Sequence, residues 1–452
     1  MFSRPRLGWI LIALALLISV AAVACSSDDN GAVSTDNTPA AVDATPTPYT
    51  GTIVTPEDVT RKDGSATKTA VVDWGFMFEL SGPAEVIGFG QPTSDGVKLA
   101  VKEINDAGGF QVGDTVYTIH LIEEDTRSDV AQTIAVAQKL VQDDKVNVIF
   151  GPATLGETEA TTITQQAHVL HLCPCQEREQ HALSSVEKAH GESQWAFQTL
   201  LPFSLLVDQG AKTFHTQWPD LRTMAFICQN TQTGHDICGR TKNAYAAQGV
   251  EIIGDIQYFP VGTTDYKPFL TALKAQGDID FLYNYDNPIN TATIVRQALE
   301  LDVGKLHLVT VPATLVRALV GRPLTVPVSA GAAPRQGVQP TSQKAADFFA
   351  RYAAYKGGQD KLPIANFVSL MTYDYAYMVA AAMQQAGTVD DTTAIVGKLE
   401  TLHYDGVAED DLFFNSRHLA VHGTEPCIVQ TGADDKETIE CTHYLAPPEA
   451  AK

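Results

Sequence analysis

The stretch DGVKLAVKEINDAGGF, residues 95–110, decides the fold class of this chain. Between Val97 and Ile104 its apolar residues recur at the i, i+3, i+4, i+7 spacing of an amphipathic helix, and Gly108 and Gly109 end that helix. A buried strand is predicted before the helix, at 69–78, and a second strand after it, at 115–125. A strand, a helix and a second strand in this order indicate a βαβ unit, whose two strands belong to one parallel sheet.

The same alternation of strands and helices continues along the chain and restarts after residue 198. Two such runs predict an α/β protein with two doubly wound parallel-sheet lobes, each with its own core. In folds of this kind, ligands bind outside the carboxyl ends of the strands. We therefore expect a ligand cleft between the two lobes, with the strand ends of one lobe facing those of the other.

The charge of the chain limits the partners that it can bind. Its 452 residues include 53 acidic and 31 basic residues, which gives a formal net charge of −22. Binding to nucleic acid normally needs a patch of Lys and Arg, and docking on anionic lipid needs basic residues as well. We therefore expect no nucleic acid among its partners and no peripheral docking on an anionic membrane surface.

The N-terminus has the features of a secretory signal. Two arginines precede an apolar run at 7–22, and small residues then lead directly to Cys25. This order predicts a signal peptide over residues 1–24. The VAAVAC stretch resembles a bacterial lipobox, whose cysteine becomes the lipidated first residue of the exported protein, so we expect lipidation at Cys25. A membrane-anchor helix that is kept is the alternative.

The segment that follows, residues 25–69, is predicted to be a flexible linker behind the lipid. It contains many Ser, Asp, Thr, Pro and Gly residues and shows no hydrophobic periodicity. A flexible tether of this length would let a globular body work just off a membrane surface.

Six cysteines remain if Cys25 carries lipid, and an exported protein can pair them as disulfides. The sequence alone does not choose among the many possible connectivities. Proximity favours two short loops, Cys228 with Cys238 and Cys427 with Cys441. The second pair flanks two predicted strands around a turn, so we expect a disulfide across a hairpin there.

The chain carries none of the common catalytic motifs: no GxxxxGK phosphate loop, no HExxH helix and no GxSxG elbow. His168, His171, Cys173 and Cys175 form a cluster that suggests a metal site. Alternate residues of an extended strand step about 6.6 Å apart, so His171 and Cys175 would lie roughly 13 Å apart. That span is too far for one ion unless the chain bends at Pro174. Packed strand residues or a disulfide explain the cluster more simply, so we expect no metal, no cofactor and no enzymatic activity. Thiol chemistry at Cys173 and Cys175 is the enzymatic alternative.

Six segments carry motifs of one known family: ELSGP (79–83), DGVKLAVKEINDAGGF (95–110), IEEDTRSDVAQTIAVAQKLV (122–141), VIFGPATLGETEA (148–160), DIDFLYNYDNP (278–288) and IVRQALELDVG (294–304). Together they resemble the periplasmic-binding-protein-like type I family. The resemblance is to the leucine/isoleucine/valine-binding branch, whose members feed ABC transporters, and it runs from about residue 71 to residue 445.

The resemblance implies lobes that are built from discontinuous parts of the chain. Lobe I would comprise residues 70–198 and 333–406, and lobe II residues 199–332 and 407–446. Members of this family make and break no bond. Their ligand binds between the lobes, which close about a hinge and so shift a population from open to closed.

The pocket implied by the resemblance departs from the amino-acid-binding pattern. Members that bind an α-amino acid usually have Ser at the position of Leu155 and Thr at the position of Glu177. Thr154 or Thr158 could supply a hydroxyl instead. The backbone amide of Leu155 can still donate to a ligand carboxylate.

Two acidic residues near the expected cleft suggest a preference for ligand charge. Asp286, with Tyr285 beside it, lies where the family often has an aromatic residue. If Glu177 and Asp286 both face the ligand, they disfavour an anion and attract a cation. Alternatively, Glu177 pairs with Arg178 or Lys188 and does not meet the ligand.

Ser81 lies in the first turn at the edge of the expected cleft, where it either contacts the ligand or caps the turn. The other candidates come from the turn after the third strand of lobe I, from the segment just past its fourth strand, and from the end of a strand of lobe II. The full set of candidate ligand-binding residues is Ser81, Thr154, Leu155, Cys175, Glu177, Tyr285 and Asp286.

These observations predict a lipid-anchored, extracytoplasmic solute-binding protein of an ABC importer. It would capture a small polar ligand, an amino acid or a related amide or amine, by hinge closure, and deliver it to a membrane permease. The alternative is a sensory protein that presents its ligand to a membrane receptor.

Overall fold

The computed structural model describes most of the chain after residue 48. Cys25, Cys175 and Glu177 lie outside the described residues, so lipidation and two of the ligand-binding candidates stay predictions. Among the described residues, no helix has the length and apolar character needed to cross a membrane. The described residues are 49–174, 195–200, 207, 210–211, 218, 220, 222–286, 288–309, 313–334, 342–363, 367–415, 418–421, 424–431 and 437–441.

The first sheet has six strands in the order β2-β3-β1-β4-β5-β6, and all neighbours are parallel except β2 and β3. The strands are β1 (Lys68–Phe78), β2 (Phe110–Val112), β3 (Thr115–Asp125), β4 (Val148–Phe150), β5 (Leu170–Cys173) and β6 (Ala196–Gln198). Trp74 and Phe76 of β1 pack on one face of the sheet and Met77 on the other, and all three are buried. Burial on both faces is what a central parallel strand requires. It confirms the expected buried strand for residues 74–78, whereas Thr69, Val71 and Asp73 in its first half are exposed.

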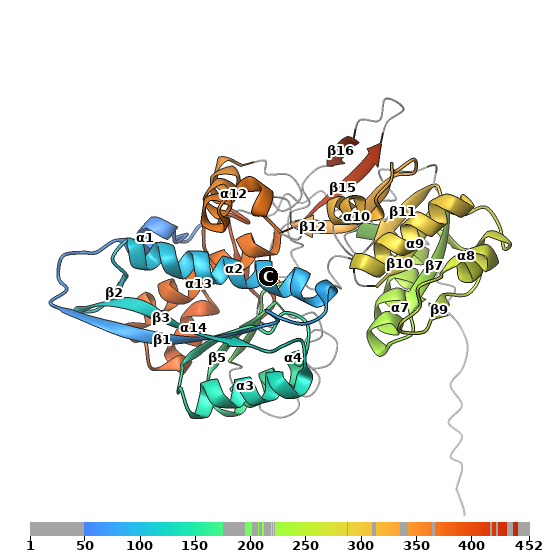
Figure 1. Cartoon of the computed structure of the whole chain (residues 1–452). Helices are drawn as coiled ribbons and strands as arrows, with labels where there is room; N and C mark the ends of the chain where they lie inside the picture. The colour runs from blue at the N-terminus through green and yellow to red at the C-terminus, as the bar shows by residue number, and fades with distance from the viewer. Residues whose placement is uncertain are drawn as a thin grey trace, which may run out of the picture. The chain divides into compact units, whose positions relative to one another are not determined.

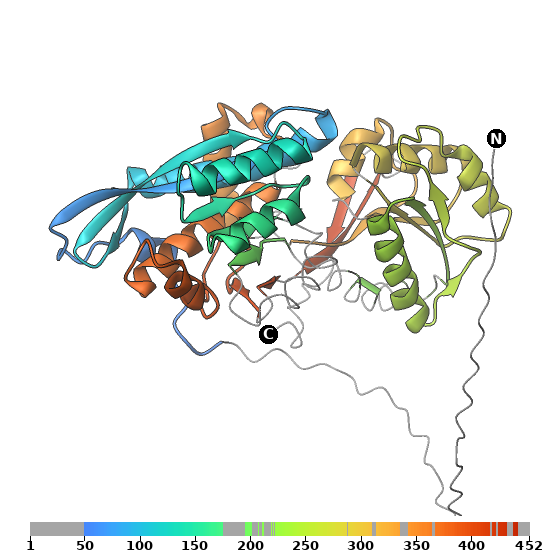
Figure 2. The same ribbon diagram turned by 90° about the horizontal axis from the view of Figure 1, so that it is seen from below.

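Helices cover both faces of this sheet (Figures 1 and 2). α2 (Ala84–Asp106) and α13 (Phe367–Ala386) pack on the face of Trp74, and α3 (Val130–Gln142) and α4 (Glu157–Gln166) pack on the face of Met77. The apolar stripe of α2 is buried, as its spacing predicts.

The second sheet has its own core. Its strands follow the order β16-β15-β12-β11-β10-β7-β8, and β9 also pairs with β7. The neighbours from β12 to β8 are parallel, whereas β15 and β16 are antiparallel additions. The strands are β7 (Thr223–Gln229), β8 (Glu251–Ile252), β9 (Gln257–Phe259), β10 (Phe281–Tyr285), β11 (Leu306–Val309), β12 (Val328–Pro334), β15 (Thr424–Thr431) and β16 (Glu437–Cys441).

Helices also cover this second sheet on both faces. The side chains on one face of β7 pack with α7 (Gln232–Ala247). Those on its other face pack with α8 (Lys267–Lys274) and α9 (Pro288–Leu301). α10 (Ala313–Val320) joins α9 over β11 and β12. The two doubly wound α/β units expected from the alternating pattern are therefore present.

The chain passes between the two cores three times. It leaves the first core after Leu200 and enters the second by Val207, and it returns after β12. The returning elements are α12 (Gln343–Lys356), η2 (Gln359–Lys361), α13, α14 (Thr392–Leu399), β13 (Phe413–Phe414) and β14 (Ala420–Val421). Since Phe414 and Ala420 belong to the first core and β15 to the second sheet, the last passage lies between β14 and β15. The lobe boundary expected at residue 406 is thus better placed there.

The flexible linker predicted for 25–69 is wrong from Tyr49 onward. Tyr49 stacks on His403, and α1 (Pro56–Thr60) begins with a capping box between Thr55 and Asp58. Val59 of this helix is fully buried in the first core. The contacts come from residues far along the chain, which local composition does not reveal.

Replacing Val59 with Ala tests whether this segment is part of the folded lobe. We expect Val59→Ala to lower the free energy of unfolding by about 2 kcal/mol, because it leaves a cavity in a closed core. The matched control is Val71→Ala, since Val71 is 64% exposed and its truncation should cost less than about 0.5 kcal/mol. Urea unfolding measures both, and equal losses would contradict this description.

Asp374 of α13 is a buried acid that holds a loop of the first lobe. Its carboxylate accepts hydrogen bonds from the backbone amides of Val407 and Ala408, at 2.9 and 2.8 Å. Burial nevertheless raises the pKa of Asp374 from its ordinary value of 3.8 to about 7. Folding therefore favours the protonated acid, which contributes stability at acidic pH that is lost as the pH rises towards 7.

The variant Asp374→Asn isolates this contribution. Because Asn does not titrate, we expect the free energy of unfolding of the variant to fall less steeply than that of the wild type between about pH 4 and pH 7. Urea unfolding of both proteins across this range measures the two slopes. Identical slopes would show that Asp374 does not titrate there.

Candidate ligand-binding site

Three strands of the first sheet bring their carboxyl ends to one edge. β1 pairs in parallel with β3 on one side and with β4 on the other. The turns that follow these strands therefore lie next to one another, at the edge where open α/β sheets bind ligands. Ser81, Thr154 and Leu155 belong to these neighbouring turns.

Ser81 caps the turn between β1 and α2. Its hydroxyl donates to Asp125 Oδ2 at 2.6 Å, and the amides of Leu80 and Ser81 donate to Oδ1 of the same carboxylate at 3.1 and 3.3 Å. Burial alone would raise the pKa of Asp125, but these hydrogen bonds hold it below its ordinary value. The capping role considered for Ser81 is thus present.

The turn after β4 is shaped by a close approach of the backbone. Gly151 has a φ of 93°, and a Cβ atom on it would lie 1.9 Å from the carbonyl oxygen of Met77. Only glycine fits this position. The chain then runs through Ala153, Thr154 and Leu155 to the start of α4, with their backbone amides gathered in one short turn.

Glu79, the residue directly after β1, fills that turn. Its Oε1 accepts from the amides of Thr154 and Leu155, both at 2.9 Å, and from the Thr154 hydroxyl at 3.1 Å. Its Oε2 accepts from the amide of Ala153 at 3.0 Å. The donors expected from Thr154 and Leu155 therefore meet a carboxylate of the protein itself.

Sequence reasoning missed Glu79. The available signal was an acid placed directly after the apolar stretch WGFMF (74–78), at the end of the strand where open α/β sheets bind ligands. An acid that is buried at such a position needs several donors, and the amides of the turn after the neighbouring strand supply them.

The second sheet gathers polar side chains at the carboxyl end of β10. Asp286 follows Tyr285 and is only 6% exposed. Its carboxylate accepts from Gln229 Nε2 at 3.2 Å and from Asn290 Nδ2 at 3.0 Å. The side chain of Asn284, two residues before Asp286, is buried with no hydrogen-bond partner among the described residues. Asp286 is thus a buried acid, fixed by two hydrogen bonds, at the carboxyl end of the strands of this sheet.

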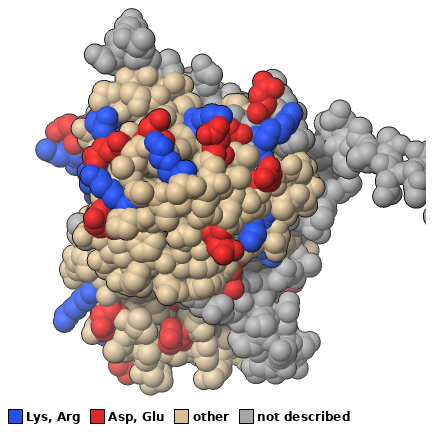
Figure 3. Space-filling view, turned by 90° about the vertical axis from the view of Figure 1, so that its right-hand side faces the viewer, with Lys and Arg blue, Asp and Glu red and all other residues tan. Residues whose placement is uncertain are grey.

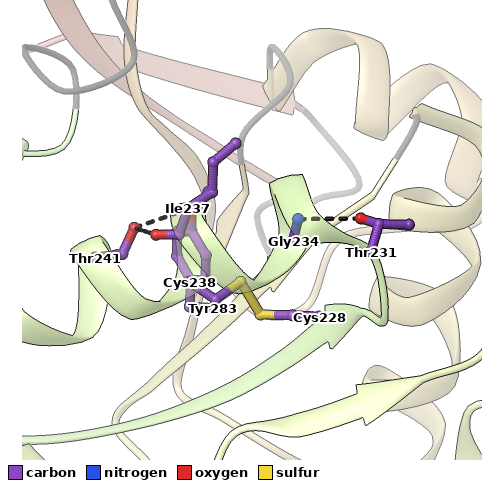
Figure 4. Close-up of a disulfide and its surroundings, with 7 residues drawn as sticks. All are labelled: Cys228, Thr231, Gly234, Ile237, Cys238, Thr241 and Tyr283. Carbon is purple, nitrogen blue, oxygen red and sulfur yellow. Dashed lines mark hydrogen bonds between the residues drawn. A yellow bond between two sulfur atoms is a disulfide. The ribbon is translucent and has the colours of Figure 1, made fainter. Parts of the chain in front are cut away.

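A disulfide joins Cys228, the last but one residue of β7, to Cys238 in α7 (Figure 4). This confirms the pairing expected from proximity. Thr231 caps α7 by accepting from the amide of Gly234 at 3.0 Å, and the Thr241 hydroxyl bonds to Tyr283 of β10. The strand end, the helix and the next strand are therefore fixed together.

The other cysteines are placed as follows. Cys427 and Cys441 lie directly opposite one another where β15 pairs with β16, and their disulfide stays a prediction. Cys173 is disulfide-bonded. The enzymatic alternative thus lacks a free thiol at Cys173 in this structure.

The histidines of the suggested metal cluster have structural contacts. His171 is buried in β5, where its ring bonds to the Thr164 hydroxyl and the Gly151 carbonyl. His168 stacks on Trp195 at 3.9 Å between ring centroids. Across the described ranges, no three His, Cys, Asp or Glu side chains are arranged to hold a metal ion.

The surface carries mixed charges. On the face drawn in Figure 3, Lys and Arg side chains are interspersed with Asp and Glu side chains. Some of the described charges form ion pairs, such as Lys267 with Glu300 at 2.8 Å and Lys305 with Asp280 at 2.6 Å. This face therefore presents no single sign of charge.

A family model described as "Periplasmic binding protein" matches residues 72–432 of this chain. The chain belongs to the periplasmic binding protein family. The match covers both sheets except β16 and the first residues of β1, and it includes the strand ends at which the described candidate site residues lie.

Solved structures share the fold of this periplasmic binding protein. A leucine-binding protein from Thermotoga maritima is 17% identical with a TM-score of 0.65, covering 83% of this chain and 99% of its own. A branched-chain amino acid transporter substrate-binding protein from Streptococcus pneumoniae, solved with isoleucine, is 20% identical with a TM-score of 0.64, covering 82% and 99%. An ABC transporter solute-binding protein from R. palustris, solved with 4-hydroxybenzoate, is 18% identical with a TM-score of 0.67, covering 84% and 98%.

The disulfide of this periplasmic binding protein can be tested by a double-mutant cycle. We expect Cys228→Ala and Cys238→Ala each to lower the free energy of unfolding by about 2–4 kcal/mol, since either removes the cross-link of a short loop. The double variant should lose no more than one of the single variants. Additive losses under non-reducing conditions would show that the two sulfurs are not bonded.

Proposed function

We propose that this protein is an extracytoplasmic, lipid-anchored solute-binding protein of an ABC importer that captures a small polar ligand by hinge closure. The observation that carries the proposal is the architecture matched by the family model. Two separately cored α/β units are joined by three passages of the chain, which suits a rigid-body closure. A non-enzymatic role follows from this mechanism, in which no bond changes.

The ligand would bind at the carboxyl ends of the strands of both sheets. In the first lobe, Ser81, Thr154 and Leu155 belong to the proposed site. In the second lobe, Tyr285 and Asp286 belong to it. Cys175 and Glu177 stay proposed on the sequence resemblance alone. Fold neighbours were solved with isoleucine and with 4-hydroxybenzoate, both small polar solutes, and we infer a ligand of similar size, an amino acid or a related amide or amine.

The N-terminal signal supports the proposed location. Residues 1–24 would direct export, and lipid at Cys25 would hold the protein at the membrane face. The part of the chain before Tyr49 would then act as the tether. The partners in this proposal are a membrane permease and the small-molecule ligand.

A thermal-shift panel of amino acids, amides, amines and aromatic acids tests the proposal on the chain from residue 26. A ligand at about 100 times its Kd should stabilise the folded state by about 2.7 kcal/mol. Small-angle X-ray scattering with the same ligand should show a smaller radius of gyration, because the lobes close on it. The control Asp286→Asn should reduce the thermal shift but leave the free protein folded.

Two results would contradict the proposal. One is chemical conversion of the stabilising compound by the protein, which would make it an enzyme. The other is a stabilising ligand that leaves the scattering curve unchanged, which would exclude hinge closure as the mode of capture.

A further inference from the structure

The carboxylate of Glu79 is fully buried and accepts four hydrogen bonds. They come from the amides of Ala153, Thr154 and Leu155 at 2.9–3.0 Å and from the Thr154 hydroxyl at 3.1 Å. A buried carboxylate is tolerated only when its lone pairs are satisfied in this way. Each oxygen of Glu79 has at least one backbone donor.

The helix on the other side holds Glu79 in place. Gly90 of α2 lies against it so closely that a Cβ atom there would be 2.5 Å from the Glu79 carbonyl oxygen and 3.1 Å from Oε2. The side chain is therefore enclosed between α2 and the turn after β4. Leaving this position would expose three amides and move a charge past a packed helix.

The donors that hold Glu79 are those that would otherwise bind an anion. Successive backbone amides at the start of a helix attract carboxylates and phosphates. Here the anion is supplied by the neighbouring strand of the same chain. A ligand carboxylate arriving at this turn would find its donors in use and would face the negative charge of Glu79.

Other acids at the two strand edges act in the same direction. Glu157, the first residue of α4, is a second buried acid beside this turn. Asp286 is a buried acid at the edge of the second sheet. Arg127 is an exposed cation, but it belongs to the turn after β3 and not to the turn after β4. Its backbone amide donates to Asp125 Oδ1 at 2.8 Å.

We propose that Glu79 is a built-in occupant of the anion-binding turn after β4, and that it selects ligands that present a neutral or cationic group to this edge. The inference rests on the proposed function and names the ligand class. Amides and amines fit this edge, whereas a carboxylate such as that of isoleucine or 4-hydroxybenzoate does not find free donors in it.

Chemical rescue tests whether the turn is an anion site filled by Glu79. The variant Glu79→Ala leaves a carboxylate-sized space lined by unpaired amides. Sodium acetate at about 100 mM, compared with the same concentration of sodium chloride, should raise the Tm of this variant by about 3 °C or more and that of the wild type by less than about 1 °C. Glu123→Ala is the matched control, because it removes an acid whose side chain is 46% exposed and frees no amide. Equal shifts in all three proteins would overturn the proposal.

Glu79→Gln keeps the test decisive if the alanine variant does not fold. Glutamine retains the volume and one acceptor but removes the charge, so the hydrogen bonds from the turn lose their charge assistance. In ¹⁵N–¹H spectra, the amide protons of Thr154 and Leu155 should move upfield, and that of Arg127, which bonds to Asp125, should stay in place. Unmoved signals at Thr154 and Leu155 would overturn the proposal.

Ligand-affinity measurements on the wild type and on Glu79→Ala separate this inference from the proposed function. Ligands found by the panel should carry an amide or amine, and Glu79→Ala should gain at least tenfold in affinity for 4-hydroxybenzoate relative to the wild type. Tight wild-type binding of 4-hydroxybenzoate, which has no cationic group, that weakens in Glu79→Ala would overturn the selection by Glu79. A panel without any ligand would count against the proposed function alone, because acetate rescue reports on the turn without it.

Discussion

The hydrogen-bonded burial of the Glu79 carboxylate is the interaction on which the ligand edge of the first lobe depends. It ties the end of the central strand β1 to the turn after its neighbour β4, so that two turns far apart in the sequence act as one rigid element. This geometry requires glycine at positions 90 and 151, because a Cβ atom at either position would clash with a backbone carbonyl oxygen. A buried acid costs free energy unless donors satisfy it. Glu79, the three amides of the turn after β4 and the two glycines are therefore needed together.

Rigid lobes are what the proposed mechanism requires of the rest of the chain. The first lobe is closed by its helices and by the N-terminal segment with Val59, and the second is reinforced where the disulfide at Cys228 joins β7 to α7. On the proposed function, the ligand then has one task, to favour the closed arrangement over the open one through its differential contacts. In the same proposal, the charge at the strand edges decides which ligands can make those contacts.

Local pattern predicted the fold well and the site only in part. The periodicity around Val97 and the short Cys228–Cys238 loop are properties of neighbouring residues, and the structure contains both. Thr154 and Leu155 were placed in the correct turn, but their donors were assigned to a ligand. That they meet Glu79 depends on the pairing of β1 with β4, which no local pattern encodes. The folded segment from Tyr49 and the last passage of the chain, between β14 and β15, depend on long-range contacts in the same way.

The most direct test is a crystal structure of the protein with a ligand bound between its lobes. The account predicts that the Glu79 oxygens stay within hydrogen-bond distance of the amides of Thr154 and Leu155, and that the ligand turns a neutral or cationic group towards this turn. A ligand carboxylate bound to those two amides, with Glu79 rotated out of the turn, would contradict it.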